Sequence, residues 1–502
     1  MIELTNASFT YPFHDAPAVR GLDLTVEPGR VVLLTGPSGC GKSTVVRMVN
    51  GLALRHFRGK LTGRVTVAGR DVAELEVADI AEHVGTLFQD PESQFFALDV
   101  RDEIAMGHEW RRVPAEVTRR RIDEAAALFG LEHLLGRSIL ALSEGQKQKV
   151  ALASIMSLGP RALILDEPTA NLDPESAVAL ARTLAELKAR GTAILVVDHR
   201  LYWLRELADE VVVMDQGLAV ARGGFSLLDD PALRARHGLR ESRVADPRPS
   251  LPSPGESHGR CISLRGLCFA HGRNAPLFTD VDLDLPLGKV IGLLGDNGTG
   301  KTTLAMLLTG LLKARQGRLS LSGEELRPME LMRRASVILQ NTDHQLHMQT
   351  VAAEVAASLP AGDKSDRDGR VAGLLDKYNI ARLAARHPQS LSGGEKQRLV
   401  IACGEAKRPD VLILDEPTSG LDGANMNLIA SCAREFAARG ACVMLISHDL
   451  ELLGSVCDCK LTLPLNRQTI KENDHDIPDR CPDPCSREDR GEPECYACRP
   501  GR

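Results

Sequence analysis

The sequence predicts an α/β protein made of two similar domains in tandem, and three observations predict it. The chain has 502 residues, which is long for a single hydrophobic core. The stretch GPSGCGKST at 36–44 returns as GDNGTGKTT at 295–303, and each copy follows a short apolar run and precedes a helix-like pattern. Other segments repeat in step with these two. The strand, glycine-rich loop and helix in this order indicate an α/β fold.

The repeat divides the chain into domains. RALILDEPT at 161–169 returns as DVLILDEPT, ALSEGQKQK at 141–149 as SLSGGEKQR, and VVDHR at 196–200 as LISHD, all shifted by the same number of positions. A constant offset indicates an internal duplication. We therefore expect domains at 1–228 and 261–465. Between them lies a linker rich in proline, serine and arginine at 229–260, and a polar tail follows at 466–502.

Composition excludes several classes of protein. The net charge of −6 and the 3% aromatic content argue against general nucleic-acid binding. The sequence contains no apolar run of about 18 residues, and its start lacks the pattern of a signal peptide. We therefore expect a cytoplasmic chain without a transmembrane helix. Its 12 cysteines are then expected to be reduced thiols or metal ligands rather than disulfides.

Both glycine-rich stretches match G-x-x-x-x-G-K-[ST], a loop that binds phosphates. Its glycines let backbone N–H groups face the phosphates, and the following helix N-terminus adds partial positive charge. The lysine reaches the outer phosphates, and the hydroxyl after it can hold Mg²⁺. A tight glycine turn is the alternative, but two matches in this context make it improbable. The predicted residues are Gly36, Gly39, Gly41, Lys42, Ser43 and Thr44, and Gly295, Gly298, Gly300, Lys301, Thr302 and Thr303.

Two acidic residues end an apolar strand in each copy, within LILDEP. The first acid, Asp166 or Asp415, can hold Mg²⁺ through water. The second, Glu167 or Glu416, is placed to orient or deprotonate an attacking water. A strand that merely stops at an acidic turn is the alternative. Its position after a phosphate loop and before a Pro-Thr turn, in both copies, favours catalysis.

The order of phosphate loop, LSGGQ-like segment, LILDEP and a late histidine resembles the ATP-binding-cassette (ABC) ATPases. The resemblance covers nearly all of 1–225 and 260–463. It implies two P-loop NTPase domains, each with a mainly parallel sheet, an antiparallel β subdomain and a helical subdomain that carries the LSGGQ signature. In that family the signature of one domain closes over ATP held by the other. The resemblance therefore implies two ATP molecules, with Mg²⁺, held head-to-tail between halves that pair as a pseudo-dimer.

The same resemblance assigns roles to further residues. An aromatic side chain stacks on adenine, a glutamine touches Mg²⁺ and the attacking water, signature residues donate to the γ-phosphate, a loop acid lies at the domain interface, and a histidine contacts the γ-phosphate. In this order the matching residues are Tyr11 (with His271 in the second copy), Gln89 and Gln340, Ser143 with Gly145 and Ser392 with Gly394, Asp173 and Asp422, and His199 and His448.

Two departures from the family pattern fall in one composite site. The first signature reads LSEGQ, with Glu144 where the family usually has glycine, and His271 stands where the first copy has Tyr11. A carboxylate aimed at a γ-phosphate would repel it, although the side chain could point away. We therefore expect unequal sites, with the Lys301 site binding or turning over ATP less well.

The segment LFQDPESQFFALDVRDEIAMGHE at 87–109 resembles the Q-loop region of energy-coupling-factor (ECF) ATPases. The second copy keeps Gln340, Asn341, Gln345 and Val351 of that style. The resemblance implies a peripheral protein at the cytoplasmic face of the membrane. Its partners would be an integral membrane scaffold and a substrate-binding subunit, with a vitamin, a vitamin precursor, cobalt or nickel as substrate and no nucleic acid.

Two alternatives remain. A fused sugar-importer ATPase has the same length and duplication, but its second phosphate loop is often eroded, whereas GDNGTGKTT is intact. A soluble two-cassette factor that acts on ribosomes usually joins its halves by a long charged helix, whereas this joint is short and proline-rich.

Four cysteines crowd the tail. Cys481, Cys485, Cys495 and Cys498 could hold Zn²⁺ tetrahedrally, although their spacing is not standard. Redox cross-linking or an inert tail is the alternative.

Overall fold

The computed structural model describes residues 1–502 except 256–259, 273–274, 297, 340–341, 361–365 and 466–502. Residues Met1–Pro464 form one compact unit, which contains both copies of the repeat. Gln340 and the four cysteines of the predicted zinc site lie outside the described residues.

The first half begins with a four-stranded antiparallel sheet in the order β2-β1-β4-β5. Alternate side chains of β1 and β2 are buried, which is the pattern of a sheet with one face on the core. The strands are β1 (Ile2–Thr10), β2 (Val19–Val26), β4 (Lys60–Val67) and β5 (Arg70–Asp71).

A second, mainly parallel sheet forms the centre of the first half, in the order β10-β9-β3-β8-β7-β6. All residues of β3 and β8 are buried, as expected for parallel strands covered on both faces. Only the edge strand β10 runs antiparallel to its neighbour. The strands are β3 (Val31–Thr35), β6 (Val84–Leu87), β7 (Ala162–Asp166), β8 (Ala193–Val197), β9 (Glu210–Asp215) and β10 (Leu218–Gly223).

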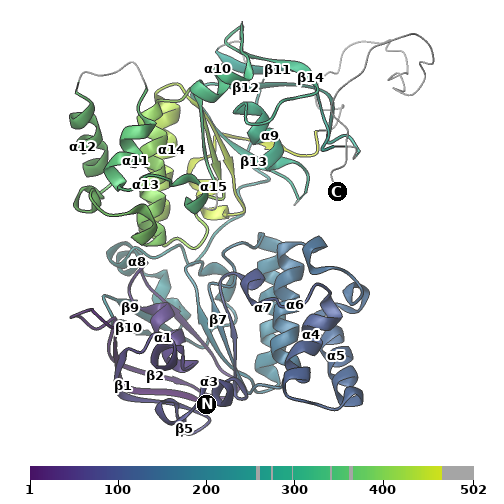
Figure 1. The fold of residues 1–502 in the computed structure, drawn as a ribbon, viewed down its shortest axis with the longest axis vertical. Helices are drawn as coiled ribbons and strands as arrows, with labels where there is room; N and C mark the ends of the chain where they lie inside the picture. The colour runs from purple at the N-terminus through teal and green to yellow at the C-terminus, as the bar shows by residue number, and fades with distance from the viewer. Residues whose placement is uncertain (256–259, 273–274, 297, 340–341, 361–365, 466–502) are drawn as a thin grey trace, which may run out of the picture. The chain divides into compact units, whose positions relative to one another are not determined.

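Three helices of the first half form a separate layer beside the central sheet (Figure 1). Helix α6 packs against both α4 and α5, and their apolar faces join the core beneath β3 and β7. Helix α1 directly follows the first phosphate loop, and α7 follows β7. The helices are α1 (Lys42–Val49), α2 (Leu52–Arg55), α3 (Val77–Ala81), α4 (Val100–Trp110), α5 (Ala115–Phe129), α6 (Glu144–Ser157) and α7 (Pro174–Ala189).

The second half repeats this plan with sheets ordered β12-β11-β14-β15 and β16-β17-β18-β13-β19. Its strands are β11 (Cys261–Phe269), β12 (Phe278–Pro286), β13 (Val290–Leu294), β14 (Gln316–Leu321), β15 (Glu324–Glu325), β16 (Ala335–Ile338), β17 (Val411–Asp415), β18 (Cys442–Ile446) and β19 (Cys459–Thr462). Its helices are α9 (Lys301–Leu308), α10 (Pro328–Arg334), α11 (Val351–Ser358), α12 (Arg367–Lys377), α13 (Gly393–Lys407), α14 (Gly423–Ala438) and α15 (Leu450–Val456).

The predicted fold class is confirmed: two α/β domains stand in tandem, each with a mainly parallel sheet, an antiparallel sheet and a helical layer. The segment between them contains the short helix α8 (Pro231–His237) and then runs without helix or strand as far as residue 255. Within the described residues, every helix is too short or too polar to cross a membrane.

Candidate functional site

The first phosphate loop connects β3 to α1 and wraps around its own lysine. Lys42 is buried, and its ammonium donates to the carbonyls of Gly36 and Pro37, both at 2.9 Å. Gly36 has φ 151°, and a Cβ there would lie 2.1 Å from the Met214 carbonyl oxygen. Gly41 has φ 109°, and its Cβ would lie 2.5 Å from the Ala18 carbonyl oxygen. The loop therefore needs glycine at both positions to keep this shape.

The second phosphate loop repeats the geometry. Lys301 donates to the carbonyls of Gly295 at 2.6 Å and Asp296 at 3.0 Å. Asp296 stands where the first loop has Pro37, so the second loop carries an extra negative charge. Such a charge opposes phosphate binding.

The residues predicted to hold Mg²⁺ lie together in both halves. The Ser43 hydroxyl is 3.4 Å from Asp166, and the Thr302 hydroxyl is 3.2 Å from Asp415. A hydroxyl and one carboxylate, completed by phosphate and water oxygens, suit Mg²⁺. In the described part of the chain, no three His, Cys, Asp or Glu side chains gather as an all-protein metal site.

The two candidate catalytic glutamates share an unusual backbone. Glu167 has φ 51° and Glu416 φ 44°, a region that side chains other than glycine seldom adopt. Each backbone N–H donates to the end of the neighbouring strand, at Val197 (2.7 Å) and Ile446 (2.9 Å). This turn aims both carboxylates toward the site.

The environment of these glutamates favours their protonated form. Burial raises the pKa of Glu167 to about 8, and the neighbouring Asp166 adds to the rise. Burial also raises the pKa of Glu416 to about 7. One carboxylate oxygen of Glu167 is buried without a hydrogen-bond partner, as expected of an atom kept for a ligand.

The two late histidines lie beside the glutamates and are neutral. The His199 Nε2 is 3.5 Å from a Glu167 oxygen, and the His448 Nε2 is 3.8 Å from a Glu416 oxygen. Burial lowers the pKa of His199 well below its usual range and the pKa of His448 to about 4. A neutral imidazole can donate one hydrogen bond to a phosphate oxygen.

The adenine-stacking candidates occupy matching places. The Tyr11 hydroxyl lies 3.1 Å from the Thr44 hydroxyl, and His271 Nε2 lies 3.1 Å from the Thr303 hydroxyl. Tyr11 also accepts a hydrogen bond from Arg47 at 2.8 Å.

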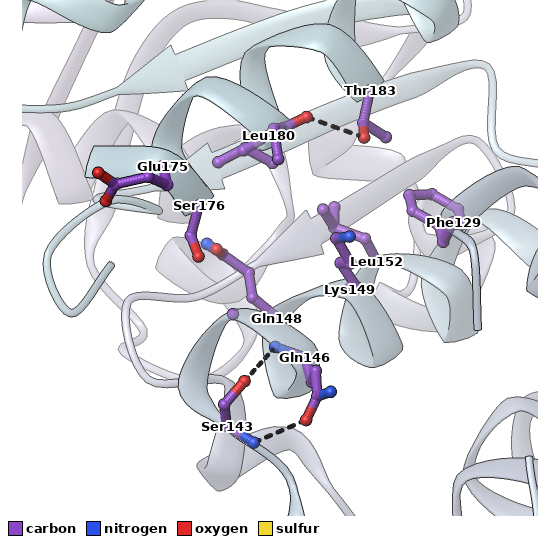
Figure 2. A pocket seen from close by; sticks show the side chains of 12 residues that line it. Phe129, Ser143, Gln146, Gln148, Lys149, Leu152, Glu175, Ser176, Leu180 and Thr183 are labelled. Carbon is purple, nitrogen blue, oxygen red and sulfur yellow. Dashed lines mark hydrogen bonds between the residues drawn. The ribbon is translucent and has the colours of Figure 1, made fainter. Parts of the chain in front are cut away.

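Each signature serine begins a helix of the helical layer. Figure 2 shows Ser143 at the start of α6, where its side chain accepts from the Gln146 N–H while Gln146 accepts from the Ser143 N–H. Ser392 caps α13 in the same way with Glu395. A Cβ on Gly145 would lie 2.8 Å from the Ser176 hydroxyl, so this glycine also lets α6 approach α7 closely.

The Glu144 side chain points away along its own helix. Its carboxylate pairs with Lys147 at 2.9 Å, and Lys147 also pairs with Glu92 of the Q-loop. The repulsion considered from the sequence is therefore reduced, because the Lys147 ammonium, shared with Glu92, partly offsets the charge of this carboxylate.

Residues of both halves line the second site. A pocket of about 710 Å³ contains Lys301 and His448 of the second half together with Ser143 and Asp173 of the first. The linker adds Arg248, which pairs with Glu175 of the first half at 2.6 Å. The geometry thus brings together the phosphate loop of one half and the signature of the other.

The first site receives the interface loop of the second half; we define the interface loops as residues 169–174 and 418–423. The Ser38 N–H of the first phosphate loop donates to Asp422 at 2.6 Å. A Cβ on Gly420 would lie 2.5 Å from Gln89 Nε2 and 2.8 Å from a Glu167 oxygen, so these side chains press against that glycine. Ser392 and Gly394 lie at the start of α13 in the second half, and a Cβ on Gly394 would lie 3.2 Å from the Asn425 Nδ2 of the same half.

Sequence reasoning assigned no role to two pairs of residues that fix the Q-loops, which we define as residues 88–98 and 339–349. Gln94 accepts from the Phe88 N–H and donates to the Thr86 carbonyl, both at 3.0 Å. Glu103 accepts from the N–H groups of Phe96 and Ala97, both at 2.9 Å. Gln345 and Glu354 make the corresponding four hydrogen bonds in the second half. Their recurrence at matching positions was the signal that could have found them.

Comparison with known proteins identifies the chain. The profile of the ABC transporter family matches residues 19–170 and 278–419, which together exceed half of the sequence. The chain belongs to the ABC transporter ATPases. A Treponema denticola protein, provisionally named an ABC transporter ATP-binding protein, is 34% identical over 465 residues, which cover 91% of this chain and 94% of that protein.

Two further similarities accompany this family membership. The Bacillus subtilis protein YkoD, provisionally named an HMP/thiamine import ATP-binding protein, is 32% identical over 496 residues, covering 92% and 90% of the two chains. The solved structure of an archaeal ribosome recycling factor, aABCE1, in complex with the stalk protein aP1, aligns over 91% of this chain and 87% of that one. Its TM-score is 0.60 at 21% identity, which shows a shared fold. As an ABC ATPase, the chain binds and hydrolyses ATP in support of transport.

The raised pKa of Glu167 predicts how stability depends on pH. The folded chain binds an extra proton between the ordinary value of 4.5 and about 8, so its free energy of unfolding falls as pH rises through this window. Glu167→Gln removes this loss. The variant should gain stability relative to wild type between pH 5 and pH 8, by several kcal/mol at most. Thermal unfolding in EDTA without nucleotide measures the difference.

The exposed Glu82→Gln serves as the control for removal of one carboxylate. The difference from wild type should change with pH more for Glu167→Gln than for this control. An equal change in both variants would show that the buried carboxylate does not titrate as stated.

The unequal surroundings of the two sites predict unequal losses of activity. Glu167→Gln should lower ATP turnover by roughly 10² or more, because it removes the candidate base of the site whose phosphate loop contains no acidic residue. Glu416→Gln acts in the site lined by Glu175 and Asp296, where the matching residues of the chain are Ala424 and Pro37, and should cost much less. Steady-state phosphate release measures both, and equal losses would refute the asymmetry.

Proposed function

We propose that this chain is the double ATPase of an ECF-type importer for a vitamin, a vitamin precursor or a transition-metal ion such as cobalt or nickel. On this proposal it lies peripherally at the cytoplasmic face of the membrane. Its partners are an integral membrane scaffold and a separate substrate-binding subunit. The observation that carries the proposal is a group of exposed apolar side chains beside the first Q-loop.

We call Phe96, Leu98 and Trp110 the aromatic patch. Their exposed fractions are 69%, 73% and 65%, and the rings of Phe96 and Trp110 meet edge to face at 5.2 Å. Covering such side chains with an apolar partner stabilises a complex by roughly 1.5–3 kcal/mol for each large residue. A group of this kind at the surface commonly marks an interaction site.

The backbone that carries this patch is held firmly. Phe96 lies in the loop segment whose N–H groups donate to Glu103 of α4. Trp110 is the last residue of α4. A partner pressing on the patch would therefore move the loop and α4 together. Gln89, which lies against Gly420 and near Glu167, belongs to the same loop. The loop thus joins the ATP site to the proposed membrane partner.

The relatives support an import role. YkoD is named for HMP/thiamine import and matches over nearly the whole chain, which favours a vitamin or a vitamin precursor as cargo. Selection of the cargo would reside in the separate membrane subunit.

The proposed cycle follows from the composite sites. ATP held by one phosphate loop would draw in the signature and interface loop of the other half, because its γ-phosphate gains donors from both. Ser43 with Asp166, and Thr302 with Asp415, would hold Mg²⁺, which neutralises phosphate charge; Gln89 and Gln340 are its further candidate ligands. After hydrolysis the halves would separate and release the Q-loops.

The alternatives are distinguished by the partner. A sugar-type importer would also bind membrane proteins, but of another class. The fold shared with the archaeal ribosome recycling factor favours no function by itself. Sedimentation with ribosomes instead of membranes would support that second reading.

The double variant Phe96→Ser, Leu98→Ser should lose its membrane partners while keeping its ATPase activity in detergent-free solution. The reason is that these side chains are exposed and make no part of the ATP sites. Affinity purification of the tagged full chain from solubilised membranes, followed by identification of the bound proteins, measures the loss.

Met329→Ser is the matched control, because this methionine is 62% exposed but lies on α10 of the second half. It should retain the partners. If wild type recovers no membrane protein, the proposed function is wrong; if both variants retain them, the aromatic patch is not the docking site.

A further inference from the structure

The linker contacts the interface loop of the second half on both sides of Asp422. Arg240 donates to the Leu421 carbonyl at 3.3 Å, and the Gly423 N–H donates to the Gly238 carbonyl at 2.8 Å. Asp422, between these two residues, accepts the Ser38 N–H of the first phosphate loop at 2.6 Å. Residues 238–240 therefore hold the backbone that presents Asp422 to the first ATP site.

The first half builds the corresponding support from its own residues. The Thr169 hydroxyl donates to Asp198 at 2.7 Å, and Asp198 accepts the Arg200 N–H at 2.9 Å. The Arg200 guanidinium donates to the carbonyls of Thr169 and Leu172, at 2.9 and 3.0 Å. Asp198 and Arg200, which flank His199, therefore hold the loop that carries His199 against the interface loop of the first half.

The second half lacks this arginine in its own repeat. Around His448, Ser447 replaces the acid and Asp449 replaces the arginine. Asp449 takes over the acid's part, because the Thr418 hydroxyl donates to it at 2.7 Å, as Thr169 does to Asp198.

The missing guanidinium comes from the linker. Arg240 donates to both oxygens of Asp449, at 2.5 and 2.6 Å, and to Glu451 at 2.8 Å. It also bonds the Leu421 carbonyl, which matches the Leu172 carbonyl held by Arg200. The same network is therefore assembled twice, once within a half and once with a linker residue.

Burial makes this ion pair sensitive to the loss of either partner. The side chains of Arg240 and Asp449 are each 2% exposed. Burial alone would raise the pKa of Asp449, but the guanidinium groups of Arg240 and Arg200 hold this pKa at about 2. Removing one partner of a buried ion pair leaves an uncompensated charge and is strongly destabilising to the local structure.

Gly423 gives independent evidence that the linker packs against this interface loop. A Cβ on Gly423 would lie 2.3 Å from the Leu239 carbonyl oxygen, so a larger residue would push the linker away. The first half has Pro174 at the matching position, which has no N–H to donate. The second interface loop is thus fitted to the linker, and the first is not.

We propose that residues 238–240 are a positioning element for the first ATP site, with Arg240 supplying to the second half the guanidinium that Arg200 supplies to the first. The linker therefore aligns Asp422 with the first phosphate loop as well as joining the halves. This inference rests on the proposed composite ATP sites.

The test uses hydrogen–deuterium exchange of the nucleotide-free full chain, read at peptides covering 419–425 and 170–176. Arg240→Leu should speed exchange at 419–425 by roughly tenfold and leave 170–176 nearly unchanged. Turnover of ATP should fall roughly tenfold or more in kcat, because a displaced positioning group is costly. Arg243→Leu, at an exposed linker arginine, is the matched control and should change neither.

A rescue variant separates positioning from general damage. Arg240→Leu combined with Ser447→Asp, Asp449→Arg and Glu451→Tyr copies the first half's own arrangement into the second. It should restore slow exchange at 419–425 and recover most of the turnover. Arg240→Lys, which keeps the charge but loses the forked donors, should lie between wild type and Arg240→Leu.

The outcomes decide separately on the two ideas. Equal acceleration at both peptides, no acceleration at 419–425, or Arg240→Lys matching Arg240→Leu would overturn the positioning role. Altered exchange in Arg240→Leu with unchanged turnover would uphold the linker contact and refute its effect on the ATP site.

Discussion

The hydrogen bond from the Ser38 amide to the Asp422 carboxylate joins the phosphate loop of one half to the interface loop of the other. Much of the remaining arrangement serves it. Gly36 and Gly41 shape the loop that presents the amide, and Gly420 lets Gln89 and Glu167 approach from the same side. Ser419 adds a second contact across the halves by donating to Asn171 at 2.7 Å. A catalytic centre shared in this way cannot form unless the halves are held in register.

The duplication keeps the residues around each ATP site but not the charges near them. Both halves keep the hydroxyl–aspartate pair, the strained glutamate and the neutral histidine. The second site differs at Asp296 in its loop, where the first loop has Pro37, and at Glu175 opposite it, where the second half has Ala424; Arg248 of the linker pairs with Glu175. Two nearly equal cradles thus lie in unequal electrostatic fields, which is how one fold can bind the same nucleotide with different strength.

Much of this was predictable from the sequence, because glycine-rich loops and strand-ending acids act through nearby backbone. Lys42, Ser43 and Asp166 lie where their spacing placed them. The Glu144 side chain could not be placed in advance, since its direction depends on Lys147 and, through it, on Glu92 in another loop. Arg240 was equally hidden: in a proline-rich segment it reads as a solvated charge, and only the folded chain brings it to Asp449, 209 positions away.

The Q-loop hydrogen bonds have a mechanical consequence. Gln94 closes one end of the first loop and Glu103 the other, so the segment bearing Phe96 has little compliance of its own. A stiff element conveys a displacement without absorbing it, so on the proposed function a movement of α4 would reach the membrane partner with little loss. Loosening either end would let the loop bend locally, and the chain would then hydrolyse ATP without moving its partner.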